Sequence, residues 1–213
     1  MSPKKQPLIR MIHFLSGTKN SFKTFLVLGI IILIAYSSIH IQSSYKSETY
    51  PSFDEAFKYV LKNEGGYSNS DLDAGGETNY GIASNFNPGV DVKKLSLNEA
   101  KNIYKKNYWD VGRYGEIPNR VIAIKTFDNC VMMGEKQAGI ILQRAIIACG
   151  HQIVVDGEIG EQTFEAIKAI KNHEGLLWAL RAETINFFHQ LVKSKPNQSI
   201  FLMGWIARVF RTP

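Results

Sequence analysis

Cysteines and metal-binding patterns are scarce in this chain. Its 213 residues contain two cysteines, Cys130 and Cys149, both within apolar stretches of helical character. Either a disulfide, formed if the chain leaves the cytoplasm, or two buried free thiols fits this pattern. No group of His, Cys, Asp or Glu has the spacing of metal ligands, so we expect no cofactor. Internal repeats and low-complexity tracts are also lacking, which favours an ordinary packed domain.

An excess of basic over acidic charge is nearly absent from the body of the chain, although the net charge is +6. Residues 1–24 hold five of the 25 Lys and Arg residues and no acid, and the other 20 basic residues face 19 acidic ones. A basic face for nucleic acid is therefore not expected. After Glu183 the chain has no acidic residue but four basic ones: Lys193, Lys195, Arg208 and Arg211. This stretch fits a solvated end, or contact with an anionic polymer.

Long hydrophobic runs occur only at residues 25–41. These 17 residues are marginal for a bilayer span, which needs ~20 predominantly apolar residues. A cleaved signal peptide, a permanent anchor and a signal-anchor that later leaves the bilayer all fit. We favour an uncleaved transmembrane signal-anchor, because the cleavage pattern around Tyr36 is weak. The basic leader, 1–24, should then stay in the cytoplasm, and residues 42–213 should lie on the outer, periplasmic side of the cytoplasmic membrane.

Helical periodicity dominates after a short linker at 42–51. Ser52 and Glu55 form a capping box at the start of a helix, which Gly65 and Gly66 should end. A second capping box, Ser96 to Glu99, opens a helix that continues through Trp109. Further helical segments are expected at 120–148, with a break near Gly134, and at 161–172, 174–193 and 198–210. Residues 67–90 are rich in Gly, Asn, Ser and Asp and predict a loop or a small β-hairpin. The expected fold is mainly α.

Glu64 is the first candidate for chemistry. It shares a helix face with Phe57, Val60 and Leu61, because offsets of seven, four and three return to one side. Desolvation on this face and the negative end of the helix dipole should both raise its pKa. A carboxyl that is protonated at neutral pH can protonate the leaving oxygen of a sugar. A solvated Glu at a frayed helix end is the alternative.

A second carboxylate and a hydroxyl follow in the polar stretch. Asp73 lies nine residues beyond Glu64, and Thr78 lies fourteen beyond it. Such a carboxylate can activate water or stabilise an oxocarbenium ion, and a hydroxyl can position the water. Asp71 and Glu77 are rivals for these roles. An Asp in a glycine-rich loop can also simply form a turn.

Two runs in this region resemble the signature of glycoside hydrolase family 108, the N-acetylmuramidases and phage endolysins of the lysozyme superfamily. They are Asn-Glu-Gly-Gly-Tyr at 63–67 and Asp-Ala-Gly-Gly-Glu-Thr-Asn-Tyr-Gly-Ile at 73–82. The resemblance implies that Glu64 is the catalytic acid. The order Glu64, Asp73, Thr78 also resembles the triad of phage-type lysozymes, although their last gap is one residue longer. The family usually has Pro where Ala74 stands.

The second half is similar to the predicted peptidoglycan-binding domain that commonly follows this catalytic domain. The matching features are Leu-Gln-Arg-Ala at 142–145, Asp-Gly-Glu-Ile-Gly at 156–160 with Thr163, and 201–209. Asp156 and Gly157 can also simply form a turn, and Thr163 can cap a helix. The resemblance covers 53–210 and implies a lysozyme-like catalytic domain at 52–140, with a small glycine-rich lobe, and a helical subdomain at 141–210.

The resemblance implies cleavage of the β-1,4 bond between N-acetylmuramic acid and N-acetylglucosamine. Peptidoglycan glycan strands would be the partner, and we expect a monomer. A lytic transglycosylase and a non-catalytic, membrane-tethered peptidoglycan-binding protein are the alternatives. Four aromatic residues are candidates for lining the sugar groove, with core packing as the alternative for each: Tyr67, Tyr80, Tyr108 and Trp109. Both phage lysis and resident wall remodelling fit such an enzyme.

Overall fold

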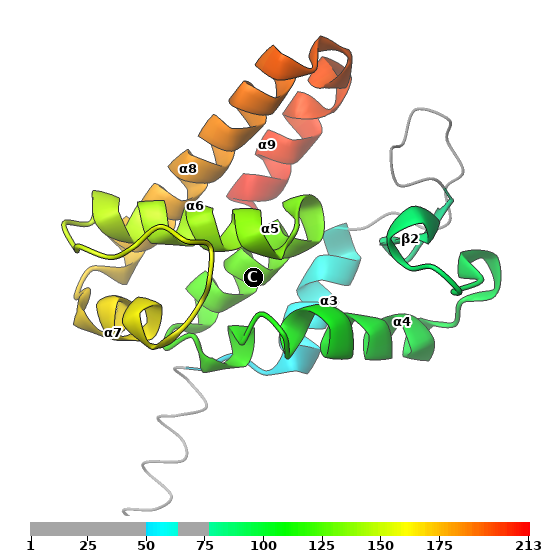
Figure 1. The fold of residues 1–213 in the computed structure, drawn as a ribbon, viewed down its shortest axis with the longest axis horizontal. Helices are drawn as coiled ribbons and strands as arrows, with labels where there is room; N and C mark the ends of the chain where they lie inside the picture. Colours follow the sequence, from blue (N-terminus) through cyan, green and yellow to red (C-terminus); the bar gives the residue numbers. More distant parts are fainter. Residues whose placement is uncertain (1–49, 64–76) are drawn as a thin grey trace, which may run out of the picture. The chain divides into compact units, whose positions relative to one another are not determined.

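The computed structural model describes residues 50–63 and 77–213 of the chain (Figure 1). These residues belong to one compact unit, Ser47–Pro213. The predicted leader at 1–24, the apolar segment at 25–41 and nearly all of the linker lie outside the described residues, as do residues 64–76. Within the described ranges, no helix combines the length and the apolar character that a membrane span needs.

The described residues are mainly α-helical, as predicted. The α-helices are α3 (Phe53–Asn63), α4 (Leu97–Tyr104), α5 (Arg120–Met133), α6 (Glu135–Ala148), α7 (Glu161–Ala169), α8 (His173–Ser194) and α9 (Leu202–Phe210). Strands β1 (Thr78–Asn79) and β2 (Ile82–Ala83) form a small antiparallel sheet. Short 3-10 turns are η2 (Ser84–Phe86), η3 (Val92–Lys94), η5 (Tyr114–Glu116) and η6 (Pro196–Phe201). The hairpin expected in 67–90 is confirmed for its described part.

Capping side chains start several helices. The Ser52 Oγ accepts a hydrogen bond from the Glu55 backbone N at 3.2 Å. The capping box between Ser96 and Glu99 is complete in both directions. After Tyr104 the backbone passes into a π-helical turn, η4 (Lys105–Trp109), so the helix predicted through Trp109 is present in a wider form.

Gly134 separates α5 from α6, as the sequence predicts. Its φ of 89° belongs to the left-handed region, which glycine adopts at little cost. Further along, α7 ends at Ala169 rather than at the expected 172, because Ile170 takes an extended conformation and the Asn172 side chain caps α8. The last predicted helix is divided, with the 3-10 turn η6 beginning at Pro196 and α9 following it.

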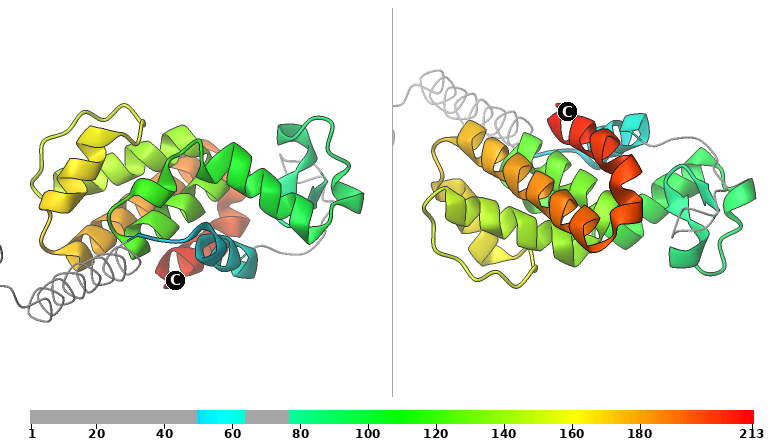
Figure 2. Two further views of the ribbon diagram at one scale, coloured as in Figure 1. Left: turned by 90° about the horizontal axis from the view of Figure 1, so that it is seen from below. Right: turned by 90° about the horizontal axis from the view of Figure 1, so that it is seen from above.

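One hydrophobic core extends through both halves of the described chain. Helices α5, α6 and α8 lie side by side, with α3 against α5 (Figure 2). The Phe127 ring of α5 is fully buried and meets the Trp109 ring edge-on, with 5.1 Å between the ring centroids. Helices α8 and α9 form an antiparallel hairpin that projects from the other helices (Figure 1). The N-terminal and C-terminal halves of the described chain therefore stabilise each other.

Both cysteines are free thiols, which is one of the two alternatives that the sequence left open. Cys130 is buried in α5, and burial raises the pKa of its thiol to about 11. Cys149 is half-buried at the end of α6, and partial burial also raises its pKa. A thiol that is buried and protonated is a poor nucleophile, so Cys130 serves packing.

Candidate functional site

The β-hairpin presents the first described candidate residue, Thr78. Strand β1 pairs with β2 in the register Thr78 to Ala83 and Asn79 to Ile82. The two residues between the strands, Tyr80 and Gly81, both have positive φ, at 50° and 75°. Positive φ at both central residues is typical of the tight type I′ turn, whose twist suits a hairpin.

The two faces of the hairpin differ. Ile82 is buried, and its partner Asn79 donates from Nδ2 to the Val92 carbonyl at 2.9 Å, so this pair faces the packed side. Side chains alternate across a strand, and the pair of Thr78 and Ala83 therefore lies on the opposite face. Both are half-buried. The Thr78 hydroxyl thus belongs to the face that points away from the packing of the hairpin.

Tyr80 holds an uncommon backbone conformation. A positive φ is rare for residues other than Gly, Asn and Asp and often marks a functional or strained position. The Tyr104 hydroxyl donates to the Tyr80 carbonyl at 3.1 Å, which fixes the turn on α4. The Tyr104 ring also packs against Phe57 of α3, with 5.5 Å between centroids. Tyr104 thus connects α4 with the hairpin turn and with α3. The sequence does not predict this role, because it shows only that Tyr104 lies in a helix.

The predicted aromatic residues have different surroundings. Tyr80 and Tyr108 are partly exposed, and a contact with sugar stays a prediction for both. Trp109 is only 5% exposed and packs between Phe53 and Phe127, so it has the core role that was the alternative. Tyr67, Glu64 and Asp73 lie outside the described residues. The structure therefore describes Thr78 alone among the three predicted catalytic residues.

The last turn of α3 is anchored by the segment that follows α9. The Arg211 guanidinium donates to Asn63 Oδ1 at 2.8 Å. The Tyr59 hydroxyl, one turn earlier, donates to the Arg211 carbonyl at 2.9 Å. Asn63 directly precedes Glu64 in the chain. Residues 148 positions apart thus fix the helix end that leads into the predicted acid.

A buried charge cluster lies beneath this anchor. Lys125 and Asp128 of α5 are one turn apart, with 3.3 Å between Lys125 Nζ and Asp128 Oδ2. The Arg208 guanidinium of α9 donates twice to Asp128 Oδ1, at 3.0 and 2.8 Å. Lys125 also donates to the Tyr59 hydroxyl at 3.0 Å. Burial lowers the pKa of Lys125, and the Asp128 carboxylate partly offsets this effect. Burial also raises the pKa of Tyr59 to about 12, with a further contribution from Asp128.

Two family models match the chain in succession. Residues 57–134 match glycosyl hydrolase 108, and residues 137–210 match the predicted peptidoglycan domain. The chain therefore contains a glycosyl hydrolase 108 domain followed by a predicted peptidoglycan domain. Among solved structures, that of Brucella abortus SagA is similar, with a TM-score of 0.61 and 27% sequence identity over 74% of this chain and 88% of that chain. The search among curated proteins finds no match. The two domains together indicate an enzyme that acts on peptidoglycan.

The Asp-Gly motif of the peptidoglycan domain has a structural role. Asp156 Oδ1 accepts hydrogen bonds from Gln143 Nε2 at 2.7 Å and from the Glu158 backbone N at 2.8 Å. Gln143 Oε1 in turn accepts from the Gly157 backbone N at 2.8 Å. Gly157 has a φ of 85°, and Gly139 of α6 is so close that a Cβ there would clash with the Gly157 carbonyl. These residues tie the loop to α6, as the alternative interpretation of the motif expected.

Thr163 does not have the capping role that the sequence allowed. Gly160 is the N-cap of α7, and no side chain makes a cap hydrogen bond there. Thr163 is buried three positions into the helix. It therefore contributes to packing in the peptidoglycan domain.

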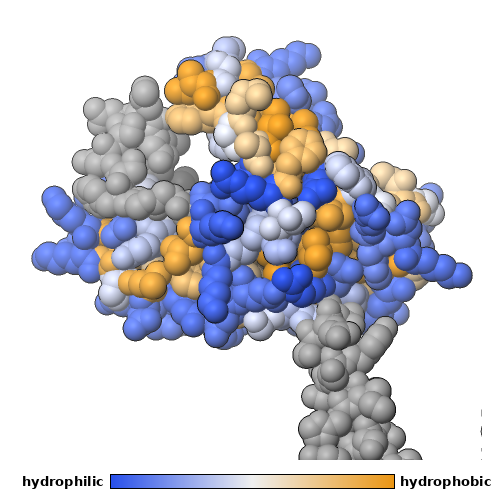
Figure 3. All heavy atoms as spheres, turned by 180° about the vertical axis from the view of Figure 1, so that it is seen from behind, coloured by the Kyte–Doolittle hydropathy of each residue, from blue (hydrophilic) through white to orange (hydrophobic). Residues whose placement is uncertain are grey.

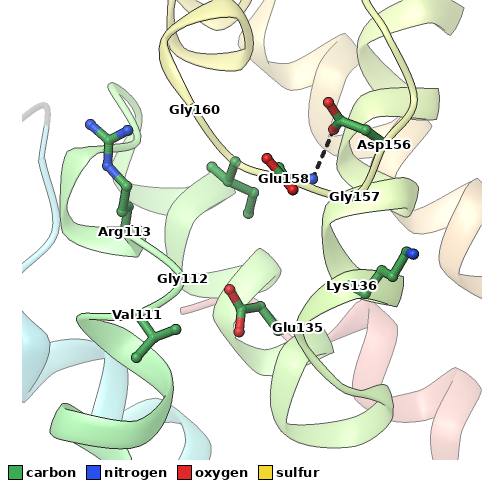
Figure 4. Close-up of a pocket in the computed structure, with 10 residues that line it drawn as sticks. Val111, Gly112, Arg113, Glu135, Lys136, Asp156, Gly157, Glu158 and Gly160 are labelled. Atoms are coloured by element: carbon green, nitrogen blue, oxygen red, sulfur yellow. Dashed lines mark hydrogen bonds between the residues drawn. The ribbon is translucent and has the colours of Figure 1, made fainter.

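A polar cleft of about 580 Å³ lies between this loop, the start of α6 and residues 111–113 (Figure 4). Its lining combines both signs of charge, and Arg113 is already paired with Glu116 and Glu161. A second cleft, of about 540 Å³, lies between α3 and the residues after α9 and includes Lys58, Lys62 and Arg211. In the described part of the chain, no cluster of three His, Cys, Asp or Glu side chains is arranged to hold a metal.

Proposed function

We propose that this protein cleaves the β-1,4 bond between N-acetylmuramic acid and N-acetylglucosamine, with Glu64 as the general acid. The observation that carries the proposal is the position of the Glu-Gly-Gly-Tyr run, 64–67, inside the segment that matches glycosyl hydrolase 108. Glu64 protonates the leaving oxygen, Asp73 activates water or stabilises the sugar cation, and Thr78 holds the water.

The described frame supports this assignment of roles. Helix α3 ends at Asn63 and is anchored there by Arg211, so the chain enters residue 64 from a fixed point. The hairpin that carries Thr78 is fastened to α4 through Tyr104. General acid catalysis requires groups held within hydrogen-bond reach of the substrate, and a rigid frame reduces the entropy cost of that arrangement.

The proposal is tested by Glu64→Gln, which keeps the size of the side chain and removes its proton. We expect clearing of purified cell walls to fall about 100-fold or more, because the leaving oxygen loses its acid. Glu174→Gln is the matched control, since Glu174 is an exposed Glu in the first turn of α8. Circular dichroism and the melting temperature should be unchanged in both variants. Near-normal clearing by Glu64→Gln would exclude Glu64 as the acid.

Product ends distinguish the enzymatic alternatives. A muramidase adds water and leaves reducing N-acetylmuramic acid ends, whereas a lytic transglycosylase leaves anhydro-muramic ends. Mass spectrometry of digested peptidoglycan separates the two, and binding without any released fragment indicates a non-catalytic protein. Comparing Asp73→Asn with Asp71→Asn and Glu77→Gln then identifies the second carboxylate: only Asp73→Asn should abolish activity.

We also infer that the catalytic domain acts on the outer side of the cytoplasmic membrane. The proposal rests on the apolar run at 25–41 and the basic residues before it, which predict a signal-anchor with its basic end in the cytoplasm. Externally added protease should then degrade the domain in spheroplasts but leave a tag at residue 1 protected. Protection of both parts would contradict this location.

A further inference from the structure

The hairpin tip, residues 193–203, exposes large apolar side chains. The exposed fraction is 68% for Ile200, 73% for Met203 and 41% for Phe201. Figure 3 shows apolar side chains gathered on the projecting helical hairpin. Single exposed apolar residues are normal on a protein surface, but neighbouring ones on a protruding turn are typical of an interaction site.

The tip is held rigidly by the helices behind it. The Phe201 ring packs on Trp205 of α9, with 5.8 Å between centroids. Trp205 stacks in turn on Phe188 of α8, with 4.8 Å between centroids and 20° between planes. The apolar side chains of the tip are therefore presented by an ordered base. A partner would bind them with little additional loss of conformational entropy.

Positive charge accompanies these apolar groups. Lys193 and Lys195 are exposed at the tip, and neither forms an ion pair with any residue that the structure describes. No acidic residue follows Glu183 in the sequence. The tip is thus both basic and apolar. On the surface of α7, by contrast, the basic residue Lys168 is paired with an acidic one, Glu165.

We propose that the hairpin tip docks on the surface of an anionic lipid bilayer. Ile200 and Met203 enter the boundary between head groups and acyl chains, and Lys193 and Lys195 contact the anionic head groups. A lipid surface suits this chemistry better than glycan does, because the two most exposed apolar side chains offer no hydrogen bonds to sugar. Such docking would orient the domain relative to the bilayer. The 22-residue helix α8 would hold its first residue about 33 Å from the tip.

A local fluorescent probe tests docking in the full chain. The label is an environment-sensitive dye on Met203→Cys in a Cys149→Ser background, in which the buried Cys130 stays unlabelled. The protein is mixed with vesicles of phosphatidylcholine alone or with phosphatidylglycerol added. We expect a shift of emission to shorter wavelength only with phosphatidylglycerol. The same dye on Val155→Cys, on the exposed loop before α7, should show no shift. Because the probe is local, binding through residues 25–41 does not mimic the result.

Charge variants measure the contribution of the lysines. A Lys near an anionic leaflet strengthens binding about fivefold, so Lys193→Gln with Lys195→Gln should lower the ratio of bound to free tip about 25-fold. Lys93→Gln with Lys171→Gln is the matched control, since both lysines are exposed and lie outside the tip. An effect of the control pair equal to that of the tip pair would contradict the proposal.

Ile200→Cys provides a second labelling site if Met203→Cys fails to fold. Absence of a spectral shift at both sites overturns the proposal. A spectral shift with purified peptidoglycan but none with vesicles would show that the tip binds glycan. A shift without vesicles that depends on protein concentration would show that the tip binds a second copy of the chain. Either result also overturns the proposal. Wall clearing by detergent-solubilised protein should be unaffected by the tip substitutions, so the docking and the proposed hydrolase activity can fail separately.

Discussion

The buried cluster around Asp128 predicts a large loss of stability from a small chemical change. Asp128 is fully buried and pairs with two cations: Lys125, whose side chain is 3% exposed, and Arg208, whose side chain is 12% exposed. Asp128→Asn keeps the volume, so no cavity forms. The two cations then lose the buried carboxylate that both of them contact. Breaking a buried pair in this way typically costs about 3–5 kcal/mol.

Urea unfolding followed by circular dichroism measures this cost. With an m value of about 2 kcal/mol/M, the midpoint should fall by about 1.5–2.5 M. Asp110→Asn is the matched control, because Asp110 pairs with Lys105 on the surface, where both side chains are about half exposed. Such a surface pair contributes about 0–1 kcal/mol. A loss below about 1 kcal/mol for Asp128→Asn would refute the argument from uncompensated burial.

A second substitution separates the charge from the packing. Replacing Lys125, Asp128 and Arg208 together by Met, Leu and Met removes every charge of the cluster while keeping similar volumes. Buried ion clusters replaced in this way are often neutral or gain stability. We therefore expect the triple variant to recover most of the stability that Asp128→Asn loses. If the triple variant is less stable than Asp128→Asn, the charges themselves contribute net stability, contrary to this reasoning.

Three further predictions concern single residues. The pKa of Tyr59 is raised to about 12, against 10 in the unfolded chain, so its contribution to stability is full below pH 10 and is lost as pH rises toward 12. Alkaline unfolding curves should show a loss of about 2–3 kcal/mol in this window. The Tyr59→Phe variant should lack this loss. A thiol reagent should label Cys149 in the native protein and Cys130 only after unfolding, so equal native rates would contradict the burial of Cys130. Tyr104→Phe removes the hydrogen bond to the Tyr80 carbonyl and should cost about 1 kcal/mol, with a larger relative loss of wall clearing if the hairpin serves catalysis.

Local signals predicted the fold well. The capping box at Ser96 and the glycine at 134 mark helix ends through interactions within a few residues, and the structure confirms both. The π-helical turn at Lys105–Trp109 escaped prediction because a single turn is too short to show a periodicity different from that of an α-helix. The Glu55 carboxylate pairs with Arg120, 65 residues away, a partner that the capping pattern does not reveal.

The candidate site was predictable in residue type more than in arrangement. The run at 64–82 identifies Glu64 and Thr78 through family resemblance, and Thr78 lies on the face of its hairpin opposite the buried Ile82. Sequence spacing gave no sign of Tyr104, because its partner is a backbone carbonyl 24 residues earlier. The pairing of Arg208 with Asp128 spans 80 residues and was equally invisible. The only sequence signal of a buried partner is the position of Lys125 and Asp128 in the middle of the apolar helix α5.

The anchoring of α3 by Arg211 affects the order in which the fold forms. Helix α3 is made early during translation, yet Arg211, which bonds its Tyr59 and Asn63, is made 152 and 148 residues after them. Such a separation slows folding, because a long loop must close before the contact forms. The last described turn of α3, at Asn63, therefore gains this anchor only after the ribosome has synthesised residue 211. A chain truncated before residue 211 would lack this anchor at Asn63.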